Sequence, residues 1–191
     1  MSAIPATTGD TGLNAERFAT HMGQRAALPQ WWLEAKKEAW NQYNALPLPT
    51  RSDERWRYSK LKGLKLEGYD LPEVASLHVP HLPDFAHSGE MTFSNRQLIG
   101  RQTLPPELIE KGVIFAPLNE ALRDHGDLVR SYFQKHPANL GSEKFVALNT
   151  AFTATGAVLY VPKGVEIPEP VVVQHTLFPV ITTQRSLTRS S

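Results

Sequence analysis

Basic and aromatic side chains alternate in the densest functional pattern of the sequence, LPLPTRSDERWRYSKLKGL at residues 46–64. The aromatic members are Trp56 and Tyr58. The basic members, with one flanking lysine, are Arg51, Arg55, Arg57, Lys60, Lys62 and Lys65. Rings that stack on bases, beside cations that contact phosphates, are typical of surfaces for single-stranded nucleic acid. A binding module that uses residues 51–65 is therefore one candidate function.

A structural role is the alternative for the same segment. Asp53 and Glu54 interrupt the basic run, and the surrounding chain is nearly neutral. Long basic side chains can keep their charged ends in water while neighbouring apolar groups pack. We favour this interpretation, in which Trp56, Tyr58 and Leu61 dock the segment on the core, and we expect no nucleic-acid partner.

Histidines form the second candidate cluster: His78, His81 and His87 lie within a stretch of ten residues that also contains Asp84. Imidazole is the commonest metal ligand in proteins, so a small zinc or iron site has to be considered. The spacing is not that of a helical pair at i and i+4, and loop histidines of this density are usually solvated. The remaining histidines are isolated in the sequence, at His21, His125, His136 and His175. We assign no metal ligand in this chain, although a metalloprotein that uses the three-histidine stretch stays an alternative.

Catalytic motifs are missing from the sequence. It contains neither of the glycine-rich phosphate loops GxxxxGK[ST] and GxGxxG, nor a GxSxG elbow or an HExxH pair. The paired carboxylates Glu107 and Glu110 fall on an expected exposed helical turn. There is no cysteine, which excludes disulfides, thiolate metal sites and cysteine nucleophiles within this chain. We therefore expect a protein that is not an enzyme, with no catalytic, cofactor-binding or metal-binding residue here.

Composition indicates an ordinary globular protein. The 191 residues suffice for one large domain, or a small domain with an appendage, and 41% of them are hydrophobic and 20% charged. A formal net charge of +1 excludes a bulk cationic binder of nucleic acid or membranes. No secretory signal and no apolar run of membrane-spanning length is present, so we expect a cytoplasmic protein without a membrane partner.

Two amphipathic helices are expected near the N-terminus, joined by a short connection into an antiparallel pair. The first follows the stripe Ala15, Phe18, Met22 and Ala26, and the second the stripe Trp32, Ala35, Ala39 and Tyr43. Glu34, Lys36, Lys37 and Glu38 fall mostly on the opposite side of the second helix. Pro29 suits its first turn, and Pro47 requires it to stop near Ala45.

Prolines and glycines divide the rest of the chain. Residues 66–106 predict loops with one or two short strands, such as 91–93, and residues 113–116 predict a buried strand. Asn119 and Asp127 are candidate N-caps of two short helices. Ser142 is a candidate N-cap of a third, in which Phe145, Leu148 and Phe152 face the same way.

Short strands separated by glycine and proline corners follow, at 157–161, at 165–167 and from residue 171. Such a sheet turns repeatedly, as a β-helix does, and one coil needs neighbours stacked on it. The polar residues 181–191 supply none, which indicates a β-helix that begins without its continuation.

Two motifs resemble the SufB/SufD family of iron–sulfur cluster assembly proteins, and most of all its SufD branch. The first is LPTRSDERWRYSKLKGL at residues 48–64, in which a proline-threonine-arginine start leads to tryptophan-x-tyrosine and then to leucine-x-glycine-leucine. The second is FVALNTAFTATGAVLYVPKGVEIPEP at residues 145–170, in which an ALN-x-AF helix leads into a valine-proline-x-glycine strand. Their order and separation also match the family.

The resemblance implies an α+β fold: a helical N-terminal region and a small mixed α/β domain that leads into the first strands of a right-handed β-helix. We expect a flexible terminus at 1–12, the mixed domain at 13–155, the start of the β-helix at 156–180 and a polar, truncated tail at 181–191. Family members are longer, so this chain is expected to be an N-terminal portion. The positions implicated in cluster building, and the surfaces for partner subunits, belong to the remaining part.

By resemblance, the intact protein is a non-catalytic scaffold that pairs with SufB-like and SufC-like subunits. The SufC partner would supply the ATP hydrolysis, and the complex would handle the iron–sulfur cluster transiently. A SufB-type paralogue is the nearest alternative. The sequence leaves open whether the chain is a fragment or a complete gene product, its oligomeric state, and whether the His78, His81 and His87 stretch binds anything.

Overall fold

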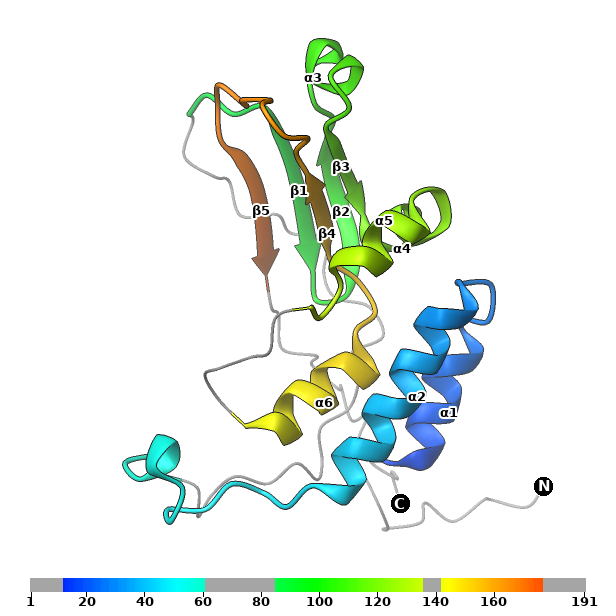
Figure 1. Ribbon diagram of the computed structural model, residues 1–191, viewed down its shortest axis with the longest axis vertical. Helices are drawn as coiled ribbons and strands as arrows, with labels where there is room; N and C mark the ends of the chain where they lie inside the picture. The colour runs from blue at the N-terminus through cyan, green and yellow to red at the C-terminus, as the bar shows by residue number, and fades with distance from the viewer. Residues whose placement is uncertain (1–11, 61–84, 136–141, 177–191) are drawn as a thin grey trace, which may run out of the picture. The chain divides into compact units, whose positions relative to one another are not determined.

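The computed structural model describes residues 12–60, 85–135 and 142–176. The chain divides into two compact units, Met1–Leu71 with Leu118–Gly156 and Pro72–Pro117 with Ala157–Ser191. Helices and small sheets are both present, which confirms the α+β class (Figure 1). Within the described ranges, no helix has both the length and the apolar character needed to cross a bilayer. The expected loose terminus and the polar tail at 181–191 lie outside the described residues, except for Gly12.

The first unit opens with two helices, α1 (Ala15–Gly23) and α2 (Gln30–Ala45). Asn14 caps α1, because its side-chain oxygen accepts a hydrogen bond from the Arg17 backbone N–H at 2.9 Å. Pro29 precedes α2 directly, where the missing N–H leaves no helical hydrogen bond unmade. Helix α2 ends at its expected residue.

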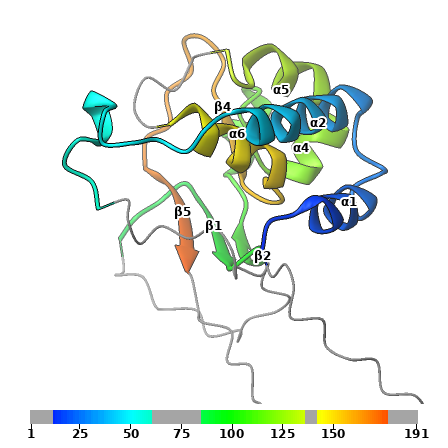
Figure 2. The same cartoon turned by 90° about the horizontal axis from the view of Figure 1, so that it is seen from below.

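The helices α1 and α2 form the expected antiparallel pair (Figures 1 and 2). Phe18 of α1 stacks on Trp40 of α2 with 4.9 Å between ring centroids, and Phe152 meets the ring of Phe18 edge-on. These rings belong to the apolar cluster of this unit. Ala26 lies beyond the end of α1, so the predicted first helix was too long.

Lys36 departs from the predicted polar side of α2. Its side chain is buried with 1% exposure, whereas Lys37 on the same helix is exposed as predicted. Lys36 follows Trp32 by four residues and precedes Ala39 by three, so all three belong to one helical stripe. The helical spacing places the lysine on the buried side, and its charge alone suggested otherwise.

Two short helices follow in this unit, α4 (Leu118–Asp124) and α5 (Gly126–Tyr132). The two predicted N-caps are wrong. Asn119 lies inside α4, because the helix already begins at Leu118, whose N–H donates to the Gly156 carbonyl at 2.8 Å. Asp127 lies in the first turn of α5, two residues after the N-cap His125, where a carboxylate is still stabilised by the positive end of the helix dipole.

Helix α6 (Glu143–Phe152) begins as predicted. Ser142 is its N-cap, with the side-chain oxygen accepting from the Lys144 N–H at 3.2 Å. Its fully buried residues are Ala147, Thr150 and Ala151. The expected stripe of Phe145, Leu148 and Phe152 is only half-buried. Small residues therefore form the closest contact, and α6 lies beside α2 (Figure 2).

The second unit contains two small sheets and one short helix. The elements are β1 (Gly89–Ser94), β2 (Gln97–Gln102), α3 (Pro106–Glu110), β3 (Ile114–Pro117), β4 (Ala157–Tyr160) and β5 (Val171–Thr176). One sheet has the order β2-β1-β5, with β1 antiparallel to β2 and parallel to β5. The other pairs β3 with β4 antiparallel. The strand expected at 91–93 and the buried strand at 113–116 are confirmed, with shifted ends. The helical turn expected to expose Glu107 and Glu110 is α3.

The core of this unit is apolar and continuous. Its buried members are Met91, Phe93, Leu104, Leu108, Val113 and Phe115. Val165 and Ile167 pack against this core, but residues 165–167 form no strand. That prediction was wrong: the two apolar side chains are partly buried, but the backbone is irregular and follows a turn in which Gly164 has a φ of 81°. The strands expected at 157–161 and from residue 171 are confirmed as β4 and β5.

Candidate functional site

The basic-aromatic segment leaves the end of α2 and forms a tight turn at Thr50. The backbone N–H of Thr50 donates to the Asp53 carboxylate at 2.7 Å, and the Asp53 N–H donates back to the Thr50 carbonyl at 3.1 Å. A short 3-10 helix, η1 (Glu54–Trp56), follows directly. Asp53 therefore shapes the backbone, which explains an acidic residue within a basic run.

Trp56 anchors the segment to the first unit. Its ring lies 5.6 Å from that of Phe145 on α6 and is half-buried. Tyr58, in contrast, is 89% exposed, so its predicted docking role is wrong. Leu61 lies outside the described residues, as do Lys62 and Lys65. Docking of the segment thus rests on one aromatic residue among those described.

Lys144 fixes the beginning of the segment. Its ammonium group donates to the carbonyls of Tyr43 and Leu46, both at 2.6 Å, and lies 4.3 Å from the centroid of the Tyr43 ring. Burial raises the pKa of the Tyr43 hydroxyl above its ordinary value of 10.0. The exit of α2 is therefore held by a cation at the negative end of that helix.

A shallow cleft of about 350 Å³ lies between the segment and the start of α6. Its lining includes Pro47, Pro49 and Trp56, together with Glu143 and Lys144. Apolar and charged groups of both signs share its wall. Its described residues therefore offer a contact surface of mixed apolar and charged character.

The exposed cations of the segment are partly neutralised by their neighbours. Arg57 lies 3.6 Å from the Glu54 carboxylate and 5.8 Å from the Tyr58 ring centroid. Arg51, Arg55 and Lys60 are also exposed. The exposed Tyr58 ring beside arginines could still stack on a nucleic-acid base, whereas the Arg57–Glu54 ion pair reduces the positive charge available to phosphates.

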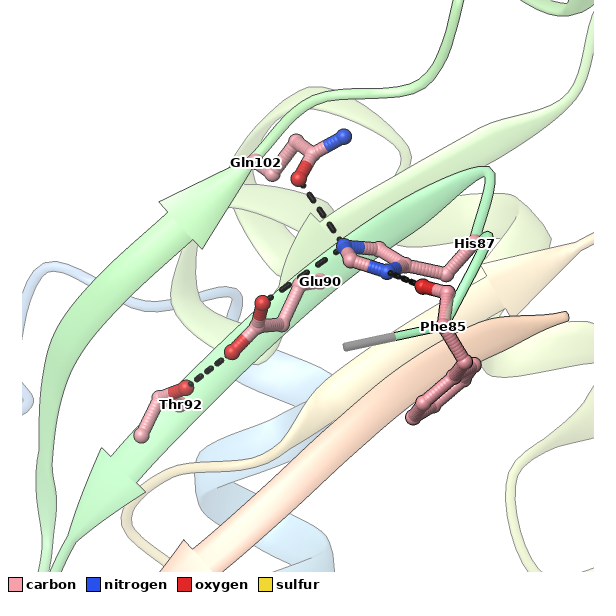
Figure 3. A network of polar contacts seen from close by, with 5 residues as sticks. All are labelled: Phe85, His87, Glu90, Thr92 and Gln102. Atoms are coloured by element: carbon pink, nitrogen blue, oxygen red, sulfur yellow. Dashed lines mark hydrogen bonds and ion pairs between the residues drawn. The ribbon is translucent and has the colours of Figure 1, made fainter. Parts of the chain in front are cut away.

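A separate polar cluster surrounds His87 in the second unit (Figure 3). Its Nδ1 lies 3.0 Å from the Phe85 carbonyl oxygen, and its Nε2 lies 2.9 Å from Gln102 Oε1 and 3.6 Å from Glu90 Oε2. The Thr92 hydroxyl donates to the other oxygen of Glu90 at 2.7 Å. The structure thus places one predicted histidine within a connected set of polar side chains.

The other members of the three-histidine stretch, His78, His81 and Asp84, lie outside the described residues. Elsewhere, His21 is buried against Phe152 and His175 stacks on Phe93. The described ranges contain no group of three or more histidine, cysteine, aspartate or glutamate residues arranged for a metal ion. His136 also falls outside them.

Sequence reasoning missed the partners of His87. Glu90 and Thr92 alternate with Met91 and Phe93, which is the period of a strand with one polar face. That signal was available, but the expected strand covered only residues 91–93. Gln102 could not be assigned, because the pairing of β1 with β2 depends on a bulge between Thr92 and Phe93 that breaks simple register counting.

A family model and several curated relatives match this chain, and they indicate the same family. The model of the SufBD protein N-terminal region matches residues 24–173, which is most of the chain. The iron–sulfur cluster assembly protein SufD of Bacillus subtilis is 31% identical over 162 residues, covering 82% of this chain and 37% of that protein. The chain belongs to the SufBD family.

Further SufBD relatives agree with this assignment. An iron–sulfur cluster assembly SufBD family protein of Staphylococcus epidermidis is 28% identical over 170 residues, covering 81% of this chain and 36% of the relative. One from Synechocystis is 29% identical over 145 residues, covering 72% of this chain and 30% of the relative. The chain therefore spans about a third of the length of these relatives and corresponds to the SufBD N-terminal region.

The two motifs that carried the resemblance fall on defined elements of the fold. Residues 48–60 of the first form the Thr50 turn and η1, and the second begins on α6 and continues through β4. Trp56 and Phe145 come from the two motifs and contact each other. The family signature thus marks a packing contact within the first unit.

Proposed function

We propose that this chain is the N-terminal portion of a SufD-like scaffold subunit that supports iron–sulfur cluster assembly. The observation that carries the proposal is the match of the SufBD N-terminal family model to residues 24–173. Identity of 31% to a protein named SufD favours the SufD branch, and a SufB-type paralogue is the alternative. The scaffold acts in the cytoplasm without catalysing a reaction itself.

The proposal includes SufB-like and SufC-like partner subunits, with ATP hydrolysed by the SufC-like subunit. The described part of the chain contributes packing contacts: the buried Lys36 joins α2 to α6, and Trp56 docks η1 on α6, both within the first unit. A structural role for this portion accounts for these features. The cluster is the cargo of the complex and not a resident cofactor of this chain.

The proposal also assigns the boundaries within the chain. Residues 13–155 form the N-terminal mixed domain, and residues 156–180 begin a right-handed β-helix. β5 pairs in parallel with β1 of the mixed domain, which is the pairing direction of a parallel β-helix, so β1 would supply the strand on which the first coil stacks. β4 also lies within residues 156–180 and pairs antiparallel with β3 of the mixed domain, so this pair would form the junction between that domain and the coils.

Co-purification from the source organism tests the proposal. The protein is tagged at its own locus, recovered under mild salt, and its bound proteins are identified by mass spectrometry. We expect SufB-like and SufC-like subunits in fixed stoichiometry, and loss of activity in iron–sulfur enzymes when the gene is silenced. Recovery of a SufD-like subunit in place of the SufB-like one would assign the chain to the SufB branch. A protein recovered without any SUF subunit, whose silencing leaves iron–sulfur enzymes active, would overturn the proposal.

A further inference from the structure

Three side chains whose atoms can act as metal ligands, those of His87, Glu90 and Gln102, converge where β1 begins, beside the end of β2 (Figure 3). The Phe85 carbonyl can only accept, so Nδ1 of His87 carries the hydrogen in their 3.0 Å contact. In a neutral imidazole, Nε2 then presents its lone pair. That lone pair faces the amide oxygen of Gln102 at 2.9 Å and a carboxylate oxygen of Glu90 at 3.6 Å. A positive centre at Nε2, either a proton or a metal ion, stabilises this arrangement of one ring nitrogen and two oxygens.

Strand pairing builds this arrangement. Glu90 of β1 and Gln102 of β2 are direct partners in the antiparallel ladder, so their side chains leave the sheet on the same side. His87 lies three residues before Glu90 and reaches the same side. The buried Thr92 hydroxyl holds one oxygen of the Glu90 carboxylate at 2.7 Å, which leaves the other oxygen for His87.

We propose that His87 Nε2, Glu90 Oε2 and Gln102 Oε1 bind a divalent cation of the zinc class. Ligand atoms about 2.0–2.2 Å from such an ion lie about 2.9–3.5 Å from each other in tetrahedral or octahedral shells. The distances from Nε2 to the two oxygens, 2.9 and 3.6 Å, approach this spacing without rearrangement of the strands. One imidazole with two oxygens suits a borderline ion such as Zn²⁺ better than a soft one.

The surroundings of the three ligands match those of known metal sites. A metal-bound histidine usually donates its second ring N–H to a backbone carbonyl or carboxylate, as His87 does to Phe85. Ligating carboxylates are themselves hydrogen-bonded, as Glu90 is by Thr92. The side chains of His87 and Glu90 are 23% and 27% exposed, so an ion can enter from solvent and keep water in its open positions. The site is independent of the proposed scaffold role.

Calorimetry on the full chain, purified without an affinity tag and stripped with a chelator, tests the site with Zn²⁺ as the probe. The titration is carried out at about pH 7.5, because Zn²⁺ binds the unprotonated Nε2 and its affinity therefore falls at lower pH. We expect one ion per chain. Glu90→Gln, which keeps the shape of the side chain, weakens binding at least about tenfold, and His87→Ala weakens it further. The matched control is His125→Ala, an exposed histidine of the first unit, which binds as the wild type does.

Two further readouts separate a site from a structural effect. Thr92→Val preserves the buried volume and removes the hydroxyl, so Zn²⁺ affinity falls about tenfold while circular dichroism stays unchanged. In ¹⁵N spectra of the imidazole, Zn²⁺ shifts Nε2 of His87 and leaves Nδ1 protonated. Unchanged urea midpoints for Glu90→Gln show that the loss is not unfolding.

Three results would overturn the proposal. The first is a wild-type chain that does not bind Zn²⁺. The second is a His87 that carries hydrogen on both nitrogens at this pH, since a proton would then fill the place of the ion. The third is binding that survives Glu90→Gln but is lost in His87→Ala, because the remaining ligands would then be other residues.

Discussion

Lys36 of α2 and Lys144 of α6 each cap the other's helix. The Lys36 ammonium donates to the carbonyls of Thr150, Ala151 and Thr153 at 3.1, 2.9 and 2.7 Å, at the C-terminal end of α6. The Lys144 ammonium donates to two carbonyls at the C-terminal end of α2. The exchange is reciprocal because the two helices run in opposite directions.

Each lysine satisfies carbonyls that a helix leaves without internal partners. It also places a positive charge at the negative end of a helix dipole. Lys36 uses all three of its ammonium hydrogens on backbone oxygens, so its burial is compensated by hydrogen bonds. Two lysines thereby join segments that are more than ninety residues apart in the sequence.

Lys36→Met tests the buried cap. Methionine fills most of the volume but leaves three carbonyls at the end of α6 without their donor. We expect the free energy of unfolding to fall by about 3 kcal/mol, measured by urea denaturation followed by circular dichroism. The exposed neighbour Lys37 is the matched control: Lys37→Met should change the free energy of unfolding by less than about 0.5 kcal/mol. Equal effects of the two substitutions would contradict the capping role.

A double-mutant cycle tests whether the two caps act together. Lys144→Met alone should lower the free energy of unfolding by about 1 kcal/mol, because the ammonium group is only partly buried. Once α6 has loosened from α2, neither lysine can reach its carbonyls. The double variant should therefore lose less than the sum of the single losses, by at least about 0.5 kcal/mol. Strict additivity would show that the caps are independent.

Trp56→Ala tests the docking of the basic-aromatic segment. The half-buried ring packs on Phe145, so its removal should lower the free energy of unfolding by about 1–2 kcal/mol. Tyr58→Ala removes an aromatic ring that is 89% exposed and should change it by less than about 0.5 kcal/mol. Chemical denaturation of both variants beside the wild type provides the measurement. A greater loss of stability from Tyr58→Ala than from Trp56→Ala would show that Trp56 does not anchor the segment.

Much of the first unit was predictable from helical periodicity and from start and stop residues. The N-cap at Ser142 and the end of α2 at Ala45 were predicted correctly, and Pro29 lies just before the first turn in which it was expected, because capping and proline sterics act locally. The burial of Lys36 was not predicted, since its compensation comes from carbonyls of a distant helix. Burial of a charge depends on such partners, and a single sequence window does not contain them.

The second unit was less predictable. β1 pairs in parallel with β5, some eighty residues later, and Val165 and Ile167 pack against the core without joining a sheet. Strand periodicity identifies an apolar side but not the neighbour that completes the ladder. The polar cluster around His87 depends on this pairing, which is why only its histidine was singled out beforehand.

The pKa of Tyr43 predicts a pH dependence at alkaline pH. Because burial raises it above 10.0, the folded state holds the phenolic proton more tightly than the unfolded state. This stabilisation is present below pH 10.0 and is lost as the pH rises through the folded pKa. In an alkaline titration of tyrosinate absorbance, Tyr43→Phe should remove a late-titrating component. If Tyr43→Phe removes no component that titrates above pH 10.0, the effect of burial on Tyr43 is contradicted.

Nucleic-acid binding by residues 51–65 is the last prediction, and we expect none. Arg57 is engaged by Glu54 at 3.6 Å, and the Asp53 carboxylate lies within the same turn. Fluorescence anisotropy of a labelled single-stranded oligonucleotide at low salt should show no titration with the full chain. Electrostatic binding would instead weaken steeply with added salt, with a slope set by the number of phosphates contacted. If such binding is found and Tyr58→Ala abolishes it, the exposed ring is a stacking platform and the segment is a binding surface.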